Sequence, residues 1–140
     1  ENEKPVIAEL VRILKPGGKI IITVPAYQWL WGVQDKISRH FRRYTAGPLT
    51  KVFKEFSELK VIKRTYFNTL LFPTIAVVRL ISRWFNIKSR KSDFDISHPV
   101  LDTLFYHIFN LEHYLLKFIN FPFGVSILLI LEKNDDNTKK

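Results

Sequence analysis

Three residues in the first third of the sequence have side chains suited to chemistry on an anionic substrate: His40, Arg42 and Arg43. A guanidinium group donates two parallel hydrogen bonds to a phosphate or carboxylate, so the arginine pair predicts an anion anchor. Imidazole exchanges protons near neutral pH, which makes His40 a candidate general base. The alternative is structural: the arginines pair with Asp35 and Glu55, and His40 is a hydrogen-bonded scaffold residue.

Aromatic residues precede this group. Tyr27, Trp29 and Trp31 are candidates for the lining of an acceptor pocket, because binding sites are rich in aromatic rings, but cores are rich in them as well. Both interpretations stay open. The sequence offers no metal site: there is no cysteine, and His107 and His113 are six residues apart on a predicted helix and point to different faces.

Periodicity and turn residues predict the elements that position these side chains. Four helices are expected where apolar residues recur every three or four positions, and three strands where the sequence has short apolar runs. The helices are predicted at 4–15, 47–56, 70–87 and 101–119, the strands at 19–24, 59–67 and 124–131, an irregular stretch at 26–46 and a polar linker at 88–98. Alternating helices and strands indicate an α/β fold.

The composition bears on the partner, the compartment and the completeness of the chain. The 140 residues carry a formal charge of +9, which favours an anionic partner, and 46% are hydrophobic, which excludes a disordered chain. The absence of cysteine fits a reducing compartment, so we expect a cytoplasmic location. The sequence contains no Met and opens directly on a helical pattern, from which we expect a fragment of a longer protein.

Two motifs together resemble a known family. The first runs from Glu9 to Pro25 and contains the turn Leu-Lys-Pro-Gly-Gly followed by the buried strand Ile-Ile-Ile-Thr-Val. The second is Asp35-x4-His40-x-Arg42-Arg43-Tyr44-Thr45, followed by a helix. They resemble the segments before and after the fifth strand of class I S-adenosylmethionine (SAM) dependent methyltransferases, in a bacterial branch that acts on small molecules and lipid intermediates. The resemblance covers residues 4–70 well and residues 71–122 poorly.

The resemblance implies a fold. The chain is expected to be the carboxyl half of a Rossmann-like methyltransferase sheet, a partial domain spanning 1–140. Its three strands correspond to the fifth, sixth and seventh of the family. The last strand is expected to run antiparallel between the other two, and residues 70–122 to form a helical insertion before it.

The resemblance also implies an enzyme that transfers the methyl group of SAM to a small-molecule or lipid-linked anionic acceptor. His40 is the expected general base, and the expected substrate-binding residues are Tyr27, Trp29, Asp35, Arg42, Arg43 and Tyr44. The Gly-rich turn that holds the cofactor in this family is missing from the chain. Gly17 and Gly18 cannot replace it, because they precede a strand, whereas the cofactor turn follows one. We therefore expect the isolated chain to be inactive, with SAM bound by the parent protein.

An alternative function is a membrane-surface module without catalysis. Residues 70–91 combine an apolar helix with Arg79, Arg83, Lys88, Arg90 and Lys91, a pattern typical of helices that lie in a membrane interface. The competing interpretation packs this helix against residues 101–119. A nucleic-acid partner is not expected, because the basic residues are scattered and no nucleic-acid-binding motif appears. No segment has the length and apolar character of a transmembrane helix, so any membrane association is expected to be peripheral.

Overall fold

A three-stranded sheet forms the centre of the computed structural model, which describes residues 3–84 and 99–135. Its strands are β1 (Lys19–Pro25), β2 (Leu59–Phe67) and β3 (Ser126–Lys133). The strand order is β1-β3-β2, and β3 runs antiparallel to both neighbours. The prediction that the last strand lies antiparallel between the other two is confirmed, as is the α/β class.

The register of β3 follows from its alternating burial. Ile127, Leu129 and Leu131 are fully buried, and the residues between them are partly exposed. Because successive side chains of a strand point to opposite faces, this pattern gives the sheet one core face. On the β2 side the pairing shifts by one residue between Val61 and Lys63, which is a bulge.

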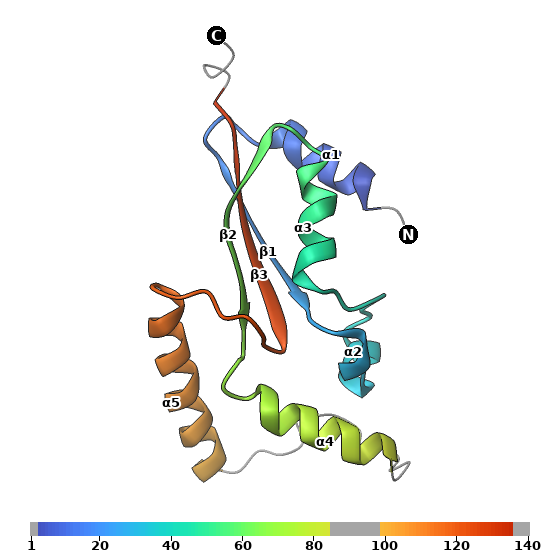
Figure 1. Ribbon diagram of the computed structural model, residues 1–140, viewed down its shortest axis with the longest axis vertical. Coiled ribbons are helices and arrows are strands. Elements are labelled where there is room, and N and C mark those ends of the chain that lie inside the picture. Colours follow the sequence, from blue (N-terminus) through green and yellow to red (C-terminus); the bar gives the residue numbers. More distant parts are fainter. Residues whose placement is uncertain (1–2, 85–98, 136–140) are drawn as a thin grey trace.

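Helices α1 (Lys4–Ile13) and α3 (Ala46–Lys54) lie on the same side of the sheet (Figure 1). Ile7 and Val11 of α1, and Leu49 and Phe53 of α3, join the buried side chains of β3 in one core cluster. Each helix carries these residues at the spacing of an amphipathic helix, so burying one face orders the whole element.

The turn between α1 and β1 is tied to the end of the sheet. Gly17 has φ +70°, a left-handed conformation that costs glycine little. The backbone N–H of Gly17 donates to the Lys133 carbonyl, and the Lys133 N–H donates to the Gly18 carbonyl, both at 2.9 Å. The Lys133 ammonium donates to the carbonyls of Val11 and Leu14 at 2.8 Å, where the helix dipole favours a positive charge.

Two further helices occupy the segment between β2 and β3. Helix α4 (Phe72–Trp84) lies across the lower end of the molecule, and α5 (Pro99–Leu116) stands beside the sheet on the side opposite to α1 and α3 (Figure 1). The predicted helices at 70–87 and 101–119 correspond to them: α4 begins two residues later than predicted, and α5 begins two residues earlier and ends three residues earlier, while residues 85–87 lie outside the described residues. The predicted linker at 88–98 lies outside the described residues. In the described ranges we find no helix that combines the length and the apolar character needed to cross a membrane.

The stretch 26–46 is more ordered than predicted. It contains the short 3-10 helix η1 (Gln28–Leu30) and the five-residue helix α2 (Val33–Ile37). Elements this short span fewer than two turns and show no apolar period, so periodicity does not detect them. Both lie between β1 and α3, and they carry Trp29 and Asp35 of the candidate site.

Candidate functional site

A buried carboxylate, that of Asp35 on α2, is the centre of the candidate site. Its side chain is 1% exposed. The Arg43 guanidinium donates from Nε to Oδ1 at 2.9 Å and from Nη2 to Oδ2 at 3.0 Å, a bidentate ion pair. The backbone N–H of Gly32 also donates to Oδ2, at 2.8 Å. An acidic side chain in the first turn of a helix commonly accepts a hydrogen bond from the backbone N–H of the residue that caps the helix.

These donors keep Asp35 ionised. Burial alone raises the pKa of the Asp35 carboxyl, but the hydrogen bonds from Arg43, the Gly32 N–H and His40, with the charge of Arg43, outweigh it. The pKa of Asp35 therefore lies below its ordinary value. At neutral pH the site holds a fixed negative charge surrounded by donors.

His40 is held by the same carboxylate. Its Nδ1 lies 3.2 Å from Asp35 Oδ1, and its backbone N–H donates to the Asp35 carbonyl at 2.8 Å. Because the ionised carboxylate only accepts hydrogen bonds, this contact places a proton on Nδ1, which in the neutral imidazole leaves the lone pair on Nε2. This is the arrangement of an oriented general base, and the imidazole is 41% exposed.

The two arginines have different surroundings. Arg43 is 8% exposed, and its third donor group, Nη1, is bound to the Ala26 carbonyl at 3.0 Å. Its Nε and both Nη atoms thus each donate inside the protein, as the alternative that pairs an arginine with Asp35 predicted, and a role of Arg43 in binding the substrate stays a prediction. The predicted partnership of Glu55 with the arginines is wrong, because Glu55 binds Lys4 at 2.6 Å.

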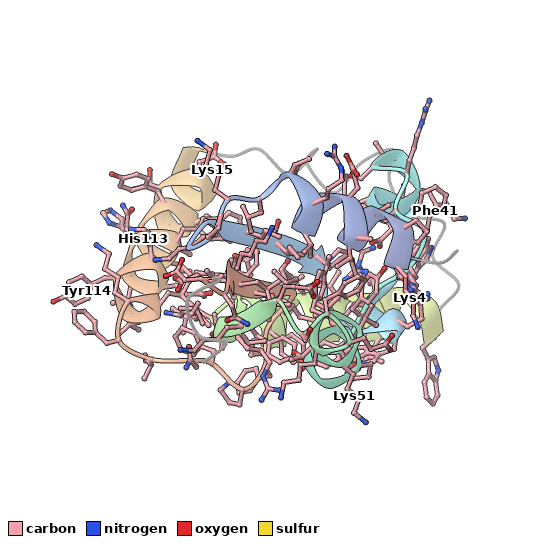
Figure 2. All side chains as sticks on the ribbon, turned by 90° about the horizontal axis from the view of Figure 1, so that it is seen from above. Lys4, Lys15, Phe41, Lys51, His113 and Tyr114 are labelled. Atoms are coloured by element: carbon pink, nitrogen blue, oxygen red, sulfur yellow. The ribbon has the colours of Figure 1, made fainter. Side chains whose placement is uncertain are left out.

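Arg42 lies at the surface and retains the properties of an anion anchor. Its Nε donates to the Tyr44 hydroxyl at 3.0 Å, its guanidinium stacks 4.9 Å from the centre of the Tyr44 ring, and it pairs with Glu3. The Tyr44 hydroxyl in turn donates to Glu3 at 2.8 Å. Between His40 and Arg42, Phe41 points to the periphery of the molecule (Figure 2).

The segment that carries these residues is fastened to the carboxyl end of β1. The Tyr44 N–H donates to the Pro25 carbonyl at 2.9 Å, and the Tyr27 N–H donates to the Tyr44 carbonyl at 2.8 Å. The result is a short parallel bridge between Ala26 and Tyr44. The site therefore lies just beyond the end of a strand, where open α/β sheets place their ligands.

Tyr27 and Trp29 belong to an aromatic cluster beside this segment. The Tyr27 ring stacks on Tyr66 with centroids 5.4 Å apart, and it contacts Trp29 and Phe72 at 5.9 and 5.7 Å. Burial, with a smaller contribution from Tyr66, raises the pKa of Tyr27 to about 12, so the Tyr27 hydroxyl stays protonated. Trp31 ends η1 and is half-buried.

Backbone strain marks the same region. Tyr27 and Arg39 have φ of 56° and 53°, a range that side-chain-bearing residues seldom adopt. Tyr27 follows β1, and Arg39 precedes His40. Strained residues persist where surrounding contacts force them, and they concentrate at functional sites.

Helix α4 reaches the site through Arg79, which sequence reasoning did not place there. A Cβ atom at Gly32 would lie 2.0 Å from Arg79 Nη1, so the guanidinium packs directly on the glycine backbone. Gly32 is also the residue whose N–H binds Asp35. A Gly three residues before an Asp is a recognisable helix start, and that signal was available in the sequence.

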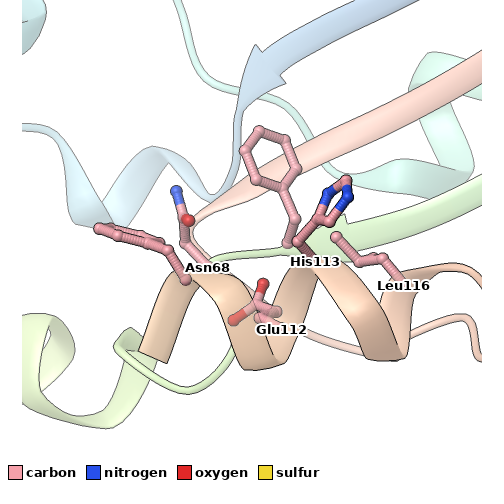
Figure 3. A pocket seen from close by; sticks show the side chains of 6 residues that line it. Asn68, Glu112, His113 and Leu116 are labelled. Atoms are coloured by element: carbon pink, nitrogen blue, oxygen red, sulfur yellow. The ribbon is translucent and has the colours of Figure 1, made fainter. Parts of the chain in front are cut away.

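A second group of residues surrounds an open hollow of about 180 Å³ at the junction of β2 and α5, lined by Phe67, Asn68, Phe109, Glu112, His113 and Leu116 (Figure 3). Glu112 is buried and accepts the N–H groups of Thr69 and Leu70 at 3.1 and 3.2 Å. Those donors precede α4, so Glu112 joins α5 to the start of α4. The hollow contains none of the predicted site residues.

Comparison with known proteins does not add to this description. No protein-family model, no curated protein and no solved structure matches the chain. In the ranges 3–84 and 99–135, acidic and histidine side chains do not gather in groups of three that would hold a metal ion. The interpretation of the site therefore depends on its own geometry.

Proposed function

We propose that this chain is the carboxyl half of a class I SAM-dependent methyltransferase that acts on a small-molecule or lipid-linked anionic acceptor. The observation that carries the proposal is the strand order β1-β3-β2 with β3 antiparallel. Sequential strands usually pair with each other, so a last strand inserted between two mutually parallel ones is an uncommon arrangement. It is the arrangement that the resemblance implied.

The position of the site supports the same proposal. Asp35, His40 and Arg42 follow the carboxyl end of β1, where ligands bind in open α/β sheets. A methyl acceptor that carries a hydroxyl or ammonium group must lose a proton for its lone pair to attack. In our proposal His40 Nε2 takes that proton, and Asp35 stabilises the imidazolium that forms.

The acceptor is held by the remaining surface groups. Arg42 binds its anionic group through the guanidinium, and Trp29 provides apolar contact beside the strand end. Asp35 and Arg43 do not touch the acceptor in this proposal. They hold His40 and the loop in place, which is a positioning role. Alignment of the two reacting centres is the main requirement of a displacement reaction.

The residues of this chain do not fit SAM itself. The two glycines before β1 are engaged with Lys133 through backbone hydrogen bonds, and the turn they form precedes a strand. A cofactor loop follows a strand and leaves its N–H groups free for the ligand. We therefore assign the cofactor to a segment of the parent protein upstream of this chain.

Calorimetric titration tests the proposal. The 140-residue chain is expected to show no saturable SAM binding, and a protein extended upstream by roughly one hundred residues, the size of half a domain, is expected to bind. Binding to the short chain would contradict the assignment of the cofactor site. Absence of binding and of methyl transfer in the extended protein would overturn the proposed function.

A further inference from the structure

The outward side of α4 is apolar. Val77, Leu80, Ile81 and Trp84 are between 47% and 87% exposed. Their spacing of three, four and seven residues from Val77 places them on one stripe of the helix. We call these four residues the α4 apolar face. Exposed apolar stripes of this kind mark interaction surfaces.

The orientation of α4 is fixed by its inward side. Ala76 is buried, and Phe72 contacts the rings of Tyr27, Trp29 and Phe123 at 5.7, 5.9 and 5.5 Å. Arg79 packs on Gly32. Arg79 thus faces the protein, while Val77, Leu80, Ile81 and Trp84 face outward.

Helix α5 also carries exposed apolar side chains. Leu104 and Leu111 are seven residues apart on its exposed side, and Tyr114 follows Leu111 by one turn. The Tyr114 ring contacts Phe118, just past the end of the helix, with centroids 5.3 Å apart. Tyr114 projects from the edge of the molecule in Figure 2. Tyrosine and tryptophan favour the boundary between water and lipid, because each has an apolar ring and one polar group.

We propose that the α4 apolar face docks on an anionic lipid surface, with α4 lying in the membrane interface. Charge selects this partner over a second copy of the chain. The formal charge is +9, and α4 contains no acidic residue, so a second copy is repelled and an anionic bilayer is attracted. Lys36 and Arg39 add exposed positive charge on and just after α2, which begins next to Arg79.

Docking in this orientation brings the candidate site to the membrane. Phe72 and Arg79, on the inward side of α4, contact Trp29 and Gly32 of the site. An acceptor anchored in the bilayer therefore reaches His40 and Arg42 without leaving the interface. Membrane docking itself does not depend on methyl transfer, so either proposal can fail while the other stands.

Vesicle flotation tests the proposal with the 140-residue chain. The chain is expected to float with vesicles of phosphatidylcholine and phosphatidylglycerol, and to retain part of that binding at high salt. Leu80→Glu combined with Ile81→Glu is expected to lower the partition coefficient by roughly tenfold or more, because it places two charges on the inserted face. The matched control is Val6→Glu combined with Ile13→Glu, two aliphatic residues of α1 that are 62% and 61% exposed.

Trp84 supplies a second readout. Its emission is expected to shift to the blue with anionic vesicles, and the shift is expected to disappear in Trp84→Phe. Circular dichroism establishes that each variant folds. The proposal is overturned if the α4 and α1 double variants bind equally, if all binding is lost at high salt, or if the α4 variant abolishes self-association of a chain that ignores vesicles.

Discussion

At the scale of single residues, the buried Asp35 carboxylate gives two adjacent arginines different tasks. Arg43 donates three hydrogen bonds inside the protein, two to Asp35 and one to the Ala26 carbonyl. Arg42 remains at the surface, braced by Tyr44 and Glu3. A bidentate partner and burial make Arg43 part of the scaffold, whereas the guanidinium of Arg42 stacks on an aromatic ring and is 46% exposed.

Substitution of Arg42 tests this division in the extended protein. Arg42→Ala is expected to lower kcat/KM for the anionic acceptor, because it removes the anion contact. The loss corresponds to a rise of about 2 kcal/mol in the activation free energy that kcat/KM reports, and SAM affinity is expected to stay unchanged. Arg39→Ala, at a neighbouring exposed arginine, is the control. Normal kinetics of Arg42→Ala would limit this residue to its contacts with Tyr44 and Glu3.

At the scale of elements, α4 depends on α5 for its starting point. The last residues before α4 have N–H groups without a partner in that helix, as at any helix start. Glu112 of α5 accepts two of them, from Thr69 and Leu70. The Thr69 hydroxyl donates to the Phe123 carbonyl at 2.6 Å, which ties the same corner to the start of β3. Glu112 therefore holds the start of α4 in place, in addition to the contacts that Phe72 and Arg79 make further along the helix.

Loss of the Glu112 carboxylate is expected to increase local opening at the start of α4 more than in the sheet. Glu112→Ala leaves two buried donors without an acceptor and is expected to lower the free energy of unfolding by about 1–3 kcal/mol. Hydrogen exchange at Thr69 and Leu70 is expected to accelerate, while exchange at Leu129 in β3 changes less. Glu58→Ala, at an exposed carboxylate, is the control. Unchanged exchange at Thr69 and Leu70 would contradict this role of Glu112.

At the scale of the whole molecule, Asp35 couples stability to pH. Its folded-state pKa is below its unfolded value of about 3.9, so its stabilisation is complete above that value and is lost as the pH falls through the folded-state pKa. The pKa of Glu9 shifts in the same direction through its hydrogen bond to Arg12, but Glu9 is exposed and solvent screens the pair.

Asp35→Asn separates this contribution from the others. The variant leaves Arg43 buried without a counter-charge and is expected to lose about 3 kcal/mol of stability at neutral pH. In urea unfolding at a series of pH values, the free energy of unfolding is expected to fall less steeply with decreasing pH for the variant than for the unsubstituted chain. An equally steep acid decline in both would show that other carboxylates control the transition.

The sequence alone was a sound guide to elements whose pattern is local and long. The strand predicted at 59–67 and the helix predicted at 4–15 are present, as Leu59–Phe67 and Lys4–Ile13. Each depends on a period or on a turn residue within a few positions. The short helices η1 and α2 were missed because fewer than two turns show no period, although the Gly32–Asp35 spacing marks the start of α2.

By itself, the sequence determined which residues share a face and which residues have the chemistry of a site. Tertiary structure decided which of those faces and side chains point inward. Arg42 and Arg43 are identical in type and adjacent, and only the pairing of Tyr44 with the end of β1 turns one toward Asp35 and the other toward solvent. Likewise, the period of α4 defines its apolar stripe, but the contacts of Phe72 and Arg79 turn that stripe outward. Periodicity carries no information about the direction of a face, because direction is set by contacts between residues far apart in the chain.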